Sequence, residues 1–231
     1  MRTIGIIGGM SWESSAQYYA LINRAVRDRL GAPHSARILL HSLDFGEVER
    51  LQHAGQWDRL GDLMAQSAQS LEAGGAQCVV LATNTMHKLA ERIEGATGLP
   101  FLHIADPTAR AIKAQGLRRV GLLGTAFTME EDFYRERLER VFGLEVLIPQ
   151  ASDRATVHRV IYEELVAGKV VEPSRDAYRD VVARLVAEGA EAVILGCTEI
   201  MLLLGEGDCA VPLFDTTALH AQAAVDFALS E

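Results

Sequence analysis

The sequence has few cysteines, and their spacing is not that of a metal site or a disulfide framework. Cys78, Cys197 and Cys209 are the three cysteines, they are widely separated, and no CxxC pair occurs. The seven histidines show no HExxH-type spacing. Because an odd number of separated cysteines favours reduced thiols, we expect neither disulfides nor a bound metal.

Long apolar runs and an excess of positive charge are also missing. No apolar run approaches the ~20 residues that span a membrane, and the N-terminal MRTIGIIGGM lacks the length and cleavage site of a signal peptide. The formal net charge of −9 argues against a nucleic-acid-binding surface. We therefore expect a cytoplasmic protein that does not bind nucleic acid. An anionic ligand is compatible with this charge, because one or two local cations can hold a carboxylate.

Short apolar runs alternate with longer amphipathic stretches along the 231 residues. The apolar runs predict strands at 3–7, 37–42, 78–82, 101–103, 119–123, 145–147, 192–195 and 211–214. The amphipathic stretches predict helices at 14–30, 57–73, 87–97, 107–115, 130–141, 154–167, 172–188 and 219–229. Nearly continuous β-branched runs are typical of parallel strands buried on both faces. The alternation therefore predicts an α/β fold with mainly parallel sheets and right-handed crossovers.

The sequence contains an internal repeat. IGIIGGMSWESSAQYY at 4–19 is similar to VGLLGTAFTMEEDFY at 120–134. AGGAQCVVLATNTMH at 73–87 is similar to AEGAEAVILGCTEIM at 187–201. The aligned pairs keep a nearly constant offset, so we expect two similar half-domains.

The repeat suggests where a ligand would bind. We expect pseudo-symmetric α/β halves at 1–105 plus 212–231 and at 106–211, with the last helix returning to the first half. Thr83 aligns with Cys197, and each follows a predicted strand. Since ligands bind beyond the carboxyl ends of strands in open α/β sheets, two facing halves would bring both turns to one cleft.

Four motifs occur in order along nearly the whole chain: IGIIGGM, NTMH, GTAFTM followed by DFY, and GCTE. Together they resemble the aspartate/glutamate racemase family of cofactor-independent amino-acid racemases. The resemblance implies two α/β domains with the substrate between them, no cofactor, and a homodimer. It also implies that one cysteine in each half exchanges a proton with one face of the substrate. Cys197 matches one of these positions, whereas Thr83 stands at the other.

Cys197 is the candidate base. A free thiol titrates near ~8.5, and a helix N-terminus or a nearby cation lowers this pKa. Because Cys197 follows an apolar strand and precedes an expected helix, backbone N–H groups would favour the thiolate. The resemblance assigns it to the α-proton of the L-enantiomer. The alternative is a small buried residue at the end of a strand, a common place for a free cysteine.

Thr83 cannot act in the same way. An alcohol is a far weaker acid than a thiol and is not ionised at neutral pH without a strong activator. It could still deliver a proton to a strongly basic carbanion, directly or through a water molecule. The alternative is that Thr83 only caps the turn.

Residues near the two turns and the first glycine-rich loop are candidates for substrate binding. The hydroxyls of Thr85 and Thr198 and the amide of Asn84 could hold a carboxylate. By resemblance, Met10 and Ser11 line the pocket. Ser11 can also be the N-cap of the first helix.

A second substrate carboxylate would need further donors. Gln52 lies in the polar stretch 44–57, which resembles a loop that reaches over the site, and Arg50 is an alternative there. Thr128 lies in the GTAFTM motif. Lys169 follows a predicted helix, in a segment where the family resemblance implies a lysine. The alternative for Gln52 and Lys169 is a solvated surface, where a helix C-terminus also favours lysine.

Four other residues have less specific interpretations. Cys78 is expected in the core and Cys209 in a loop. His87 could cap the helix that follows it, or support the site by resemblance. Glu199 could orient the second turn or tune Cys197.

Three functions are compatible with these observations. The first is an isomerase of amino-acid metabolism that interconverts L- and D-aspartate or glutamate, with Cys197 on one face and Thr83 or a water on the other. The second is a single-cysteine decarboxylase of the arylmalonate type. The third is a non-catalytic protein that binds a small acid.

Overall fold

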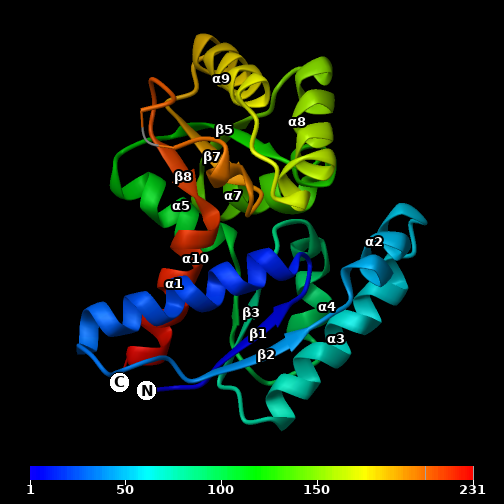
Figure 1. The fold of residues 1–231 in the computed structure, drawn as a ribbon, viewed down its shortest axis with the longest axis vertical. Coiled ribbons are helices and arrows are strands. Elements are labelled where there is room, and N and C mark those ends of the chain that lie inside the picture. The colour runs from blue at the N-terminus through cyan, green and yellow to red at the C-terminus, as the bar shows by residue number, and fades with distance from the viewer. Residues whose placement is uncertain (206, 231) are drawn as a thin grey trace. The chain divides into compact units, whose positions relative to one another are not determined.

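The computed structural model describes residues 1–205 and 207–230, which divide into two compact units (Figure 1). One unit comprises Met1–His103 and His220–Glu231, and the other comprises Ile104–Leu219. The expected halves differ from this division mainly at the point where the chain returns from the second unit to the first. The reason is that Leu213–Asp215 forms a strand of the second unit, so the chain returns to the first unit only within its last helix.

The first unit is built on a parallel sheet with the strand order β2-β1-β3-β4. Its strands are β1 (Ile4–Gly8), β2 (Ile38–Ser42), β3 (Cys78–Leu81) and β4 (Phe101–Leu102). Its helices are α1 (Trp12–Leu30), α2 (Phe45–His53), α3 (Trp57–Ala73), the 3-10 helix η1 (Thr85–Leu89), α4 (Ala90–Glu94) and most of α10 (Thr216–Leu229). Successive strand residues point to opposite faces. Ile7 and Leu81 therefore pack with α2 and α3, whereas Ile6 and Val80 pack with α1 and α10.

The second unit repeats this plan with the strand order β6-β5-β7-β8. Its strands are β5 (Arg119–Gly124), β6 (Glu145–Leu147), β7 (Ala192–Gly196) and β8 (Leu213–Asp215). Its helices are α5 (Ala105–Ala114), α6 (Ala126–Glu130), α7 (Asp132–Phe142), α8 (Ala151–Glu163), η2 (Leu165–Ala167), α9 (Glu172–Ala187) and η3 (Ile200–Leu202). Leu123 and Leu195 pack with α8 and α9, and Leu122 and Ile194 pack with α5 and α7. The predicted α/β fold with two parallel sheets is confirmed.

Glycines stand at aligned positions in both units. A Cβ atom at Gly5 would lie 2.8 Å from the backbone oxygen of Cys78, whereas one at Gly121 would lie 2.9 Å from the end of the flexible Leu185 side chain. Gly75 and Gly189, which precede β3 and β7, adopt φ angles of +88° and +98°. Only glycine takes up such angles readily, so the repeat is preserved in backbone geometry as well as in sequence.

Local structure differs from the sequence-based expectation at three places. The polar stretch after β2, expected as a loop, forms helix α2 with Asp44 as its N-cap. The helix expected at 87–97 is a 3-10 helix followed by the five-residue α4. The helix expected after Cys197 is only the three-residue η3. Both repeated turns thus lead into short 3-10 helices.

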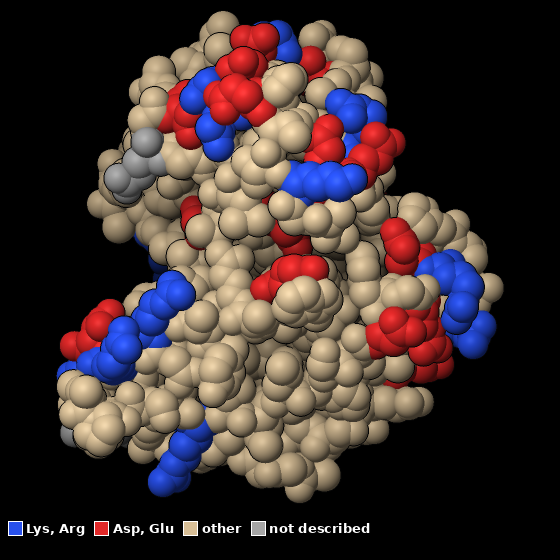
Figure 2. Space-filling view, viewed as in Figure 1, with Lys and Arg blue, Asp and Glu red and all other residues tan. Residues whose placement is uncertain are grey.

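The surface shows no segregation of charge on the face in Figure 2. Lysine and arginine side chains lie among aspartate and glutamate side chains there. Within the described residues, no helix is both long enough and apolar enough to cross a membrane.

Candidate functional site

The two repeated turns lie at the carboxyl ends of equivalent central strands. Thr83 comes two residues after β3, and Cys197 directly follows β7. Each central strand pairs with the strand that carries the first glycine motif of its unit, β1 or β5. This is the edge at which open α/β sheets bind ligands.

The turn of the second unit is organised by the carboxylate of Glu199. The Cys197 thiol donates to Glu199 Oε2 at 3.1 Å, and the Thr198 hydroxyl donates to the same oxygen at 2.6 Å. Glu199 is only 6% exposed, so this carboxylate is satisfied inside the turn. The thiol and the hydroxyl therefore share one acceptor, the Oε2 atom of Glu199.

This environment opposes the thiolate. Burial raises the pKa of Cys197 well above its ordinary value, and the negative charge of Glu199 raises it further. The backbone N–H groups of Glu199 and Thr198 lower the pKa of Cys197, but by less than burial and the charge of Glu199 raise it. The expectation of a pKa lowered by a helix N-terminus is therefore wrong, because η3 is too short to supply one and a carboxylate lies beside the sulfur.

The turn of the first unit is fixed through its backbone. The Thr83 N–H donates to Leu81 O at 2.9 Å, and the Thr83 carbonyl accepts from His87 Nδ1 at 2.7 Å. A carbonyl can only accept, so Nδ1 of His87 carries a proton. Thr83 is half-buried, while Asn84 and Thr85, which follow it, are buried.

His87 belongs to a buried cluster of three histidines that includes His103 and His220. The ring of His87 lies 4.5 Å from that of His103 and 5.9 Å from that of His220, measured between centroids. His220 Nε2 donates to Leu102 O at 2.6 Å, and its Nδ1 lies 2.8 Å from the hydroxyl of Tyr18. The cluster links α1, β4 and α10 to the turn that carries Thr83.

The loop after β1 is tied to the same turn. Ser11 is the N-cap of α1, with its hydroxyl accepting from Ser14 N–H at 3.2 Å, and Ser14 Oγ donates to Ala82 O at 3.2 Å. The capping interpretation of Ser11 is therefore correct, and it leaves a role in substrate binding open. Met10 is buried and packs in the core beside α2 and α3.

In the second unit, Thr128 lies in helix α6, directly after the corresponding loop. Thr125 caps α6 by accepting from Thr128 N–H at 3.3 Å, and the two hydroxyls lie 3.2 Å apart. Thr128 is fully buried, and its methyl group would be 3.4 Å from a Cβ atom placed on Gly196. Thr128 therefore packs against the end of β7, directly before Cys197.

The other candidates for binding a second substrate carboxylate differ in how exposed their side chains are. Gln52 is buried on α2, although the sequence placed it in a loop, and Arg50 beside it is exposed. Lys169 is exposed in the connection between η2 and α9, where its backbone N–H donates to Glu164 O at 2.9 Å. Cys78 is buried in the core of the first unit, as expected.

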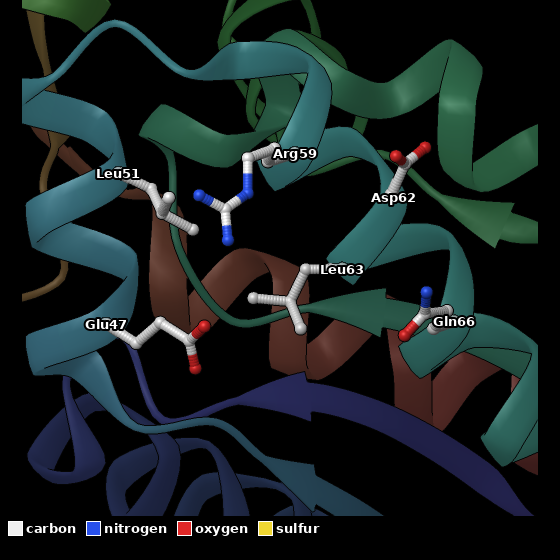
Figure 3. A pocket seen from close by; sticks show the side chains of 6 residues that line it. All are labelled: Glu47, Leu51, Arg59, Asp62, Leu63 and Gln66. Atoms are coloured by element: carbon white, nitrogen blue, oxygen red, sulfur yellow. The ribbon is translucent and has the colours of Figure 1, made fainter.

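A small surface pocket lies between α2 and α3 of the first unit. It is lined by Glu47, Leu51, Arg59, Asp62, Leu63 and Gln66. Figure 3 shows the guanidinium of Arg59 and the carboxylate of Glu47 facing the same space. None of the residues predicted to bind or transform a substrate lines this pocket.

Comparison with known proteins identifies the family. The family model described as "Asp/Glu/Hydantoin racemase" matches residues 7–224. The chain belongs to this family. The crystal structure of a candidate Asp/Glu racemase from Yersinia pestis is 53% identical, with each chain fully covered and a TM-score of 0.94. An aspartate racemase homologue from Pyrococcus horikoshii OT3 is 32% identical over the full length of both chains, with a TM-score of 0.87.

A curated relative extends the likeness to a protein with a named activity. The broad specificity amino-acid racemase RacX of Bacillus subtilis (strain 168) is 23% identical, with 96% of each chain covered. The family suggested by the sequence motifs is thus confirmed over nearly the whole chain.

Sequence reasoning missed the histidine cluster and the double role of the Glu199 oxygen. His103 and His220 are far apart in the sequence and carry no recognisable spacing. The GCTE motif contains Glu199, but its spacing does not reveal that one oxygen accepts from both neighbouring side chains.

Proposed function

We propose that the protein is a cofactor-independent racemase of aspartate or glutamate. The observation that carries this proposal is a half-buried thiol, Cys197, with a carboxylate partner at the carboxyl end of β7. Membership of the racemase family supports the reaction class. The full-length similarity to an Asp/Glu racemase candidate and to an aspartate racemase homologue supports the substrate.

The reaction consists of two proton transfers at one carbon. With an L-substrate, the Cys197 thiolate takes the α-proton, so that the Cα–H bond breaks and an S–H bond forms. The resulting carbanion then takes a proton on its opposite face from the Thr83 hydroxyl or from a water beside it. This mechanism requires Cys197 of one unit and Thr83 of the other to reach the same substrate.

The polar residues of the turns have assigned roles in this mechanism. Asn84, Thr85 and Thr198 hold the α-carboxylate, whose charge would otherwise oppose formation of a carbanion. Gln52, Thr128 and Lys169 bind the side-chain carboxylate. Met10 and Ser11 line the pocket and exclude water. The same proposal includes a cytoplasmic homodimer that works without pyridoxal phosphate and forms D-amino acids.

Chiral chromatography after incubation with single enantiomers tests the function. L-Aspartate and L-glutamate should each yield the D-enantiomer, and each D-enantiomer should yield the L-form. The Cys197→Ser variant is the matched control, since it keeps the size of the side chain but removes the acidic thiol. Absence of conversion for every member of a panel of L- and D-amino acids would exclude a racemase.

A decarboxylase is the second candidate, because only one of the two turns has a thiol. A single acid that protonates one face suffices for an enediolate formed by loss of carbon dioxide. Carbon dioxide release from an arylmalonate, with no interconversion of amino acids, would favour that reaction. A shift in the unfolding temperature by aspartate without any chemistry would instead indicate a protein that only binds small acids.

A further inference from the structure

Strand β2 is an open edge of the first sheet, since among the described strands it pairs only with β1 (Figure 1). The other three edge strands are short: β4 has two residues, and β6 and β8 have three each, including the acidic Glu145 or Asp215. Strand β2 has five residues, Ile38–Ser42, with no proline, lysine or acidic residue. Short or charged edges resist pairing with another strand, whereas a longer uncharged edge favours it.

The ladder with β1 leaves the backbone groups of alternate β2 residues facing outward. Ile4 is in register with Ile38, and its N–H donates to Arg37 O at 2.9 Å. Arg37 and every second residue after it therefore face β1. The N–H and C=O of one strand residue point to the same side, and that side alternates along the strand. The backbone groups that point away from β1 are those of Ile38, Leu40 and Ser42.

The side chains of this edge are apolar at the centre and oppositely charged at the ends. Leu40 is 46% exposed and lies beside α1, because a Cβ atom on Gly8 would be 3.0 Å from both Leu40 Cδ1 and Ser15 Cβ. Arg37 precedes the strand and Asp44 follows it. Both are exposed, and neither forms an ion pair with another described residue. Such an edge is complementary to itself when its direction is reversed.

We propose that the protein dimerises by antiparallel pairing of β2 with β2 of a second copy, about a two-fold axis at Leu40. Leu40 then lies opposite the partner's Leu40, and Ile38 lies opposite the partner's Ser42. All outward backbone groups are paired, in about six hydrogen bonds, and the two first units share one continuous sheet. At each end Arg37 lies beside the partner's Asp44, which gives two equivalent ion pairs.

The other face of the strand has room for the partner. A groove lies between β2 and α3 and is lined in part by Leu39, His41, Ser70 and Gly74. The same register places Leu39 opposite the partner's His41 on this face. A stable interface buries ~1,200–2,000 Å² in total, which is more than a five-residue strand supplies. The groove and the surface of α1 beside Leu40 therefore belong to the interface.

Pairing about a two-fold axis uses the β2 edge of each copy, so the assembly closes as a dimer and does not grow into a fibre. The proposal shares with the proposed function only the homodimer, and its test needs no substrate. An active monomer would reject this interface and retain the racemase. An inactive protein that dimerises through β2 would do the reverse.

Sedimentation velocity of the full chain measures the dimer. The wild type should be a dimer at about 100 µM. Leu40→Lys places two like charges opposite each other at the axis and should raise the dissociation constant at least about tenfold. Val141→Lys is the matched control, because Val141 of α7 is an apolar residue that is 62% exposed in the second unit, and it should leave the constant unchanged. Circular dichroism checks that both variants fold.

Cross-linking tests the position of the axis. Under glutathione disulfide, Leu40→Cys should form a disulfide-linked dimer, because the Cα atoms of opposed residues lie within the ~4.4–6.8 Å that a disulfide spans. Val141→Cys and the wild type, with its native cysteines, should remain unlinked on a non-reducing gel. A monomeric wild type, a Leu40→Lys variant that dimerises like the wild type, or no link in Leu40→Cys would each overturn the interface.

Discussion

The turns at Thr83 and Cys197 occupy the same place in two sheets of the same topology, yet they are held by different atoms. In the first unit, His87 holds the carbonyl of Thr83, so the contact fixes the position of the backbone. In the second unit, Glu199 holds the sulfur of Cys197, so the contact acts on the reactive atom itself. The two units therefore share one scaffold, while the side chains of the two turns differ in their chemistry.

Removal of the sulfur should have the largest effect on this pair of turns. Cys197→Ala should lower α-proton exchange of the L-substrate by about 10²–10⁴-fold, the range typical for loss of a general base. The measurement is the loss of the α-proton NMR signal in deuterated water. The matched change in the other turn, Thr83→Ala, should slow inversion but leave much of the exchange of L-substrate intact. A Cys197→Ala variant with unchanged exchange would remove this thiol from the mechanism.

Placing a cysteine at both turns should have the next largest effect on the rate of inversion. Thr83→Cys places a thiol at both turns and should raise the rate of inversion by about tenfold, since general acids and bases contribute ~10²–10⁴-fold and the present donor is weak. The gain must appear from L to D and from D to L alike, because the enantiomers have equal free energy in achiral solution. Chiral chromatography from both directions measures it. An unchanged rate would show that another group delivers the second proton.

Loss of the contact that fixes the first turn should change stability. His87→Leu removes the donor to the Thr83 carbonyl and leaves a buried acceptor without that bond, which costs about 1–3 kcal/mol. Unfolding in urea measures the change. Lys88→Leu, at the partly buried neighbouring position, is the control and should cost less. Equal losses in the two variants would mean that the bond to Thr83 does not stabilise the fold.

The smallest expected effects concern the hydroxyls that hold the strand ends before the turns. Ser14 Oγ donates to Ala82 O at 3.2 Å in the first unit, and Thr216 Oγ1 donates to Leu195 O at 2.8 Å in the second. Ser14→Ala and Thr216→Val should each cost about 1 kcal/mol in the free energy of unfolding. A larger cost in the second unit would agree with its shorter bond, and no cost in either would show that both carbonyls find other donors.

The sequence was sufficient for the architecture because that architecture depends on local patterns. Apolar runs at a constant offset predicted both parallel sheets, and the aligned glycines require the same backbone geometry in each. The short 3-10 helices after Thr83 and Cys197 were not predicted, because a single turn of helix depends on tertiary contacts more than on propensity.

The site was predicted less completely than the fold. The motifs identified Cys197 and the departure at Thr83, but they gave the wrong direction for the pKa of the thiol. A strand end followed by a helix would favour an anion, whereas the buried carboxylate of Glu199 disfavours it. The cluster around His87 depends on which helices return to the first sheet, and no local pattern records that.

The most direct test of the difference between the two turns uses each enantiomer in deuterated water. It compares the rate at which the α-proton exchanges with solvent with the rate at which the α-carbon inverts. If Cys197 is an efficient base and Thr83 a poor one, L-aspartate or L-glutamate will lose its α-proton faster than it inverts. The D-enantiomer will exchange slowly, and only as fast as it inverts. Equal rates of exchange for the two enantiomers would contradict this account.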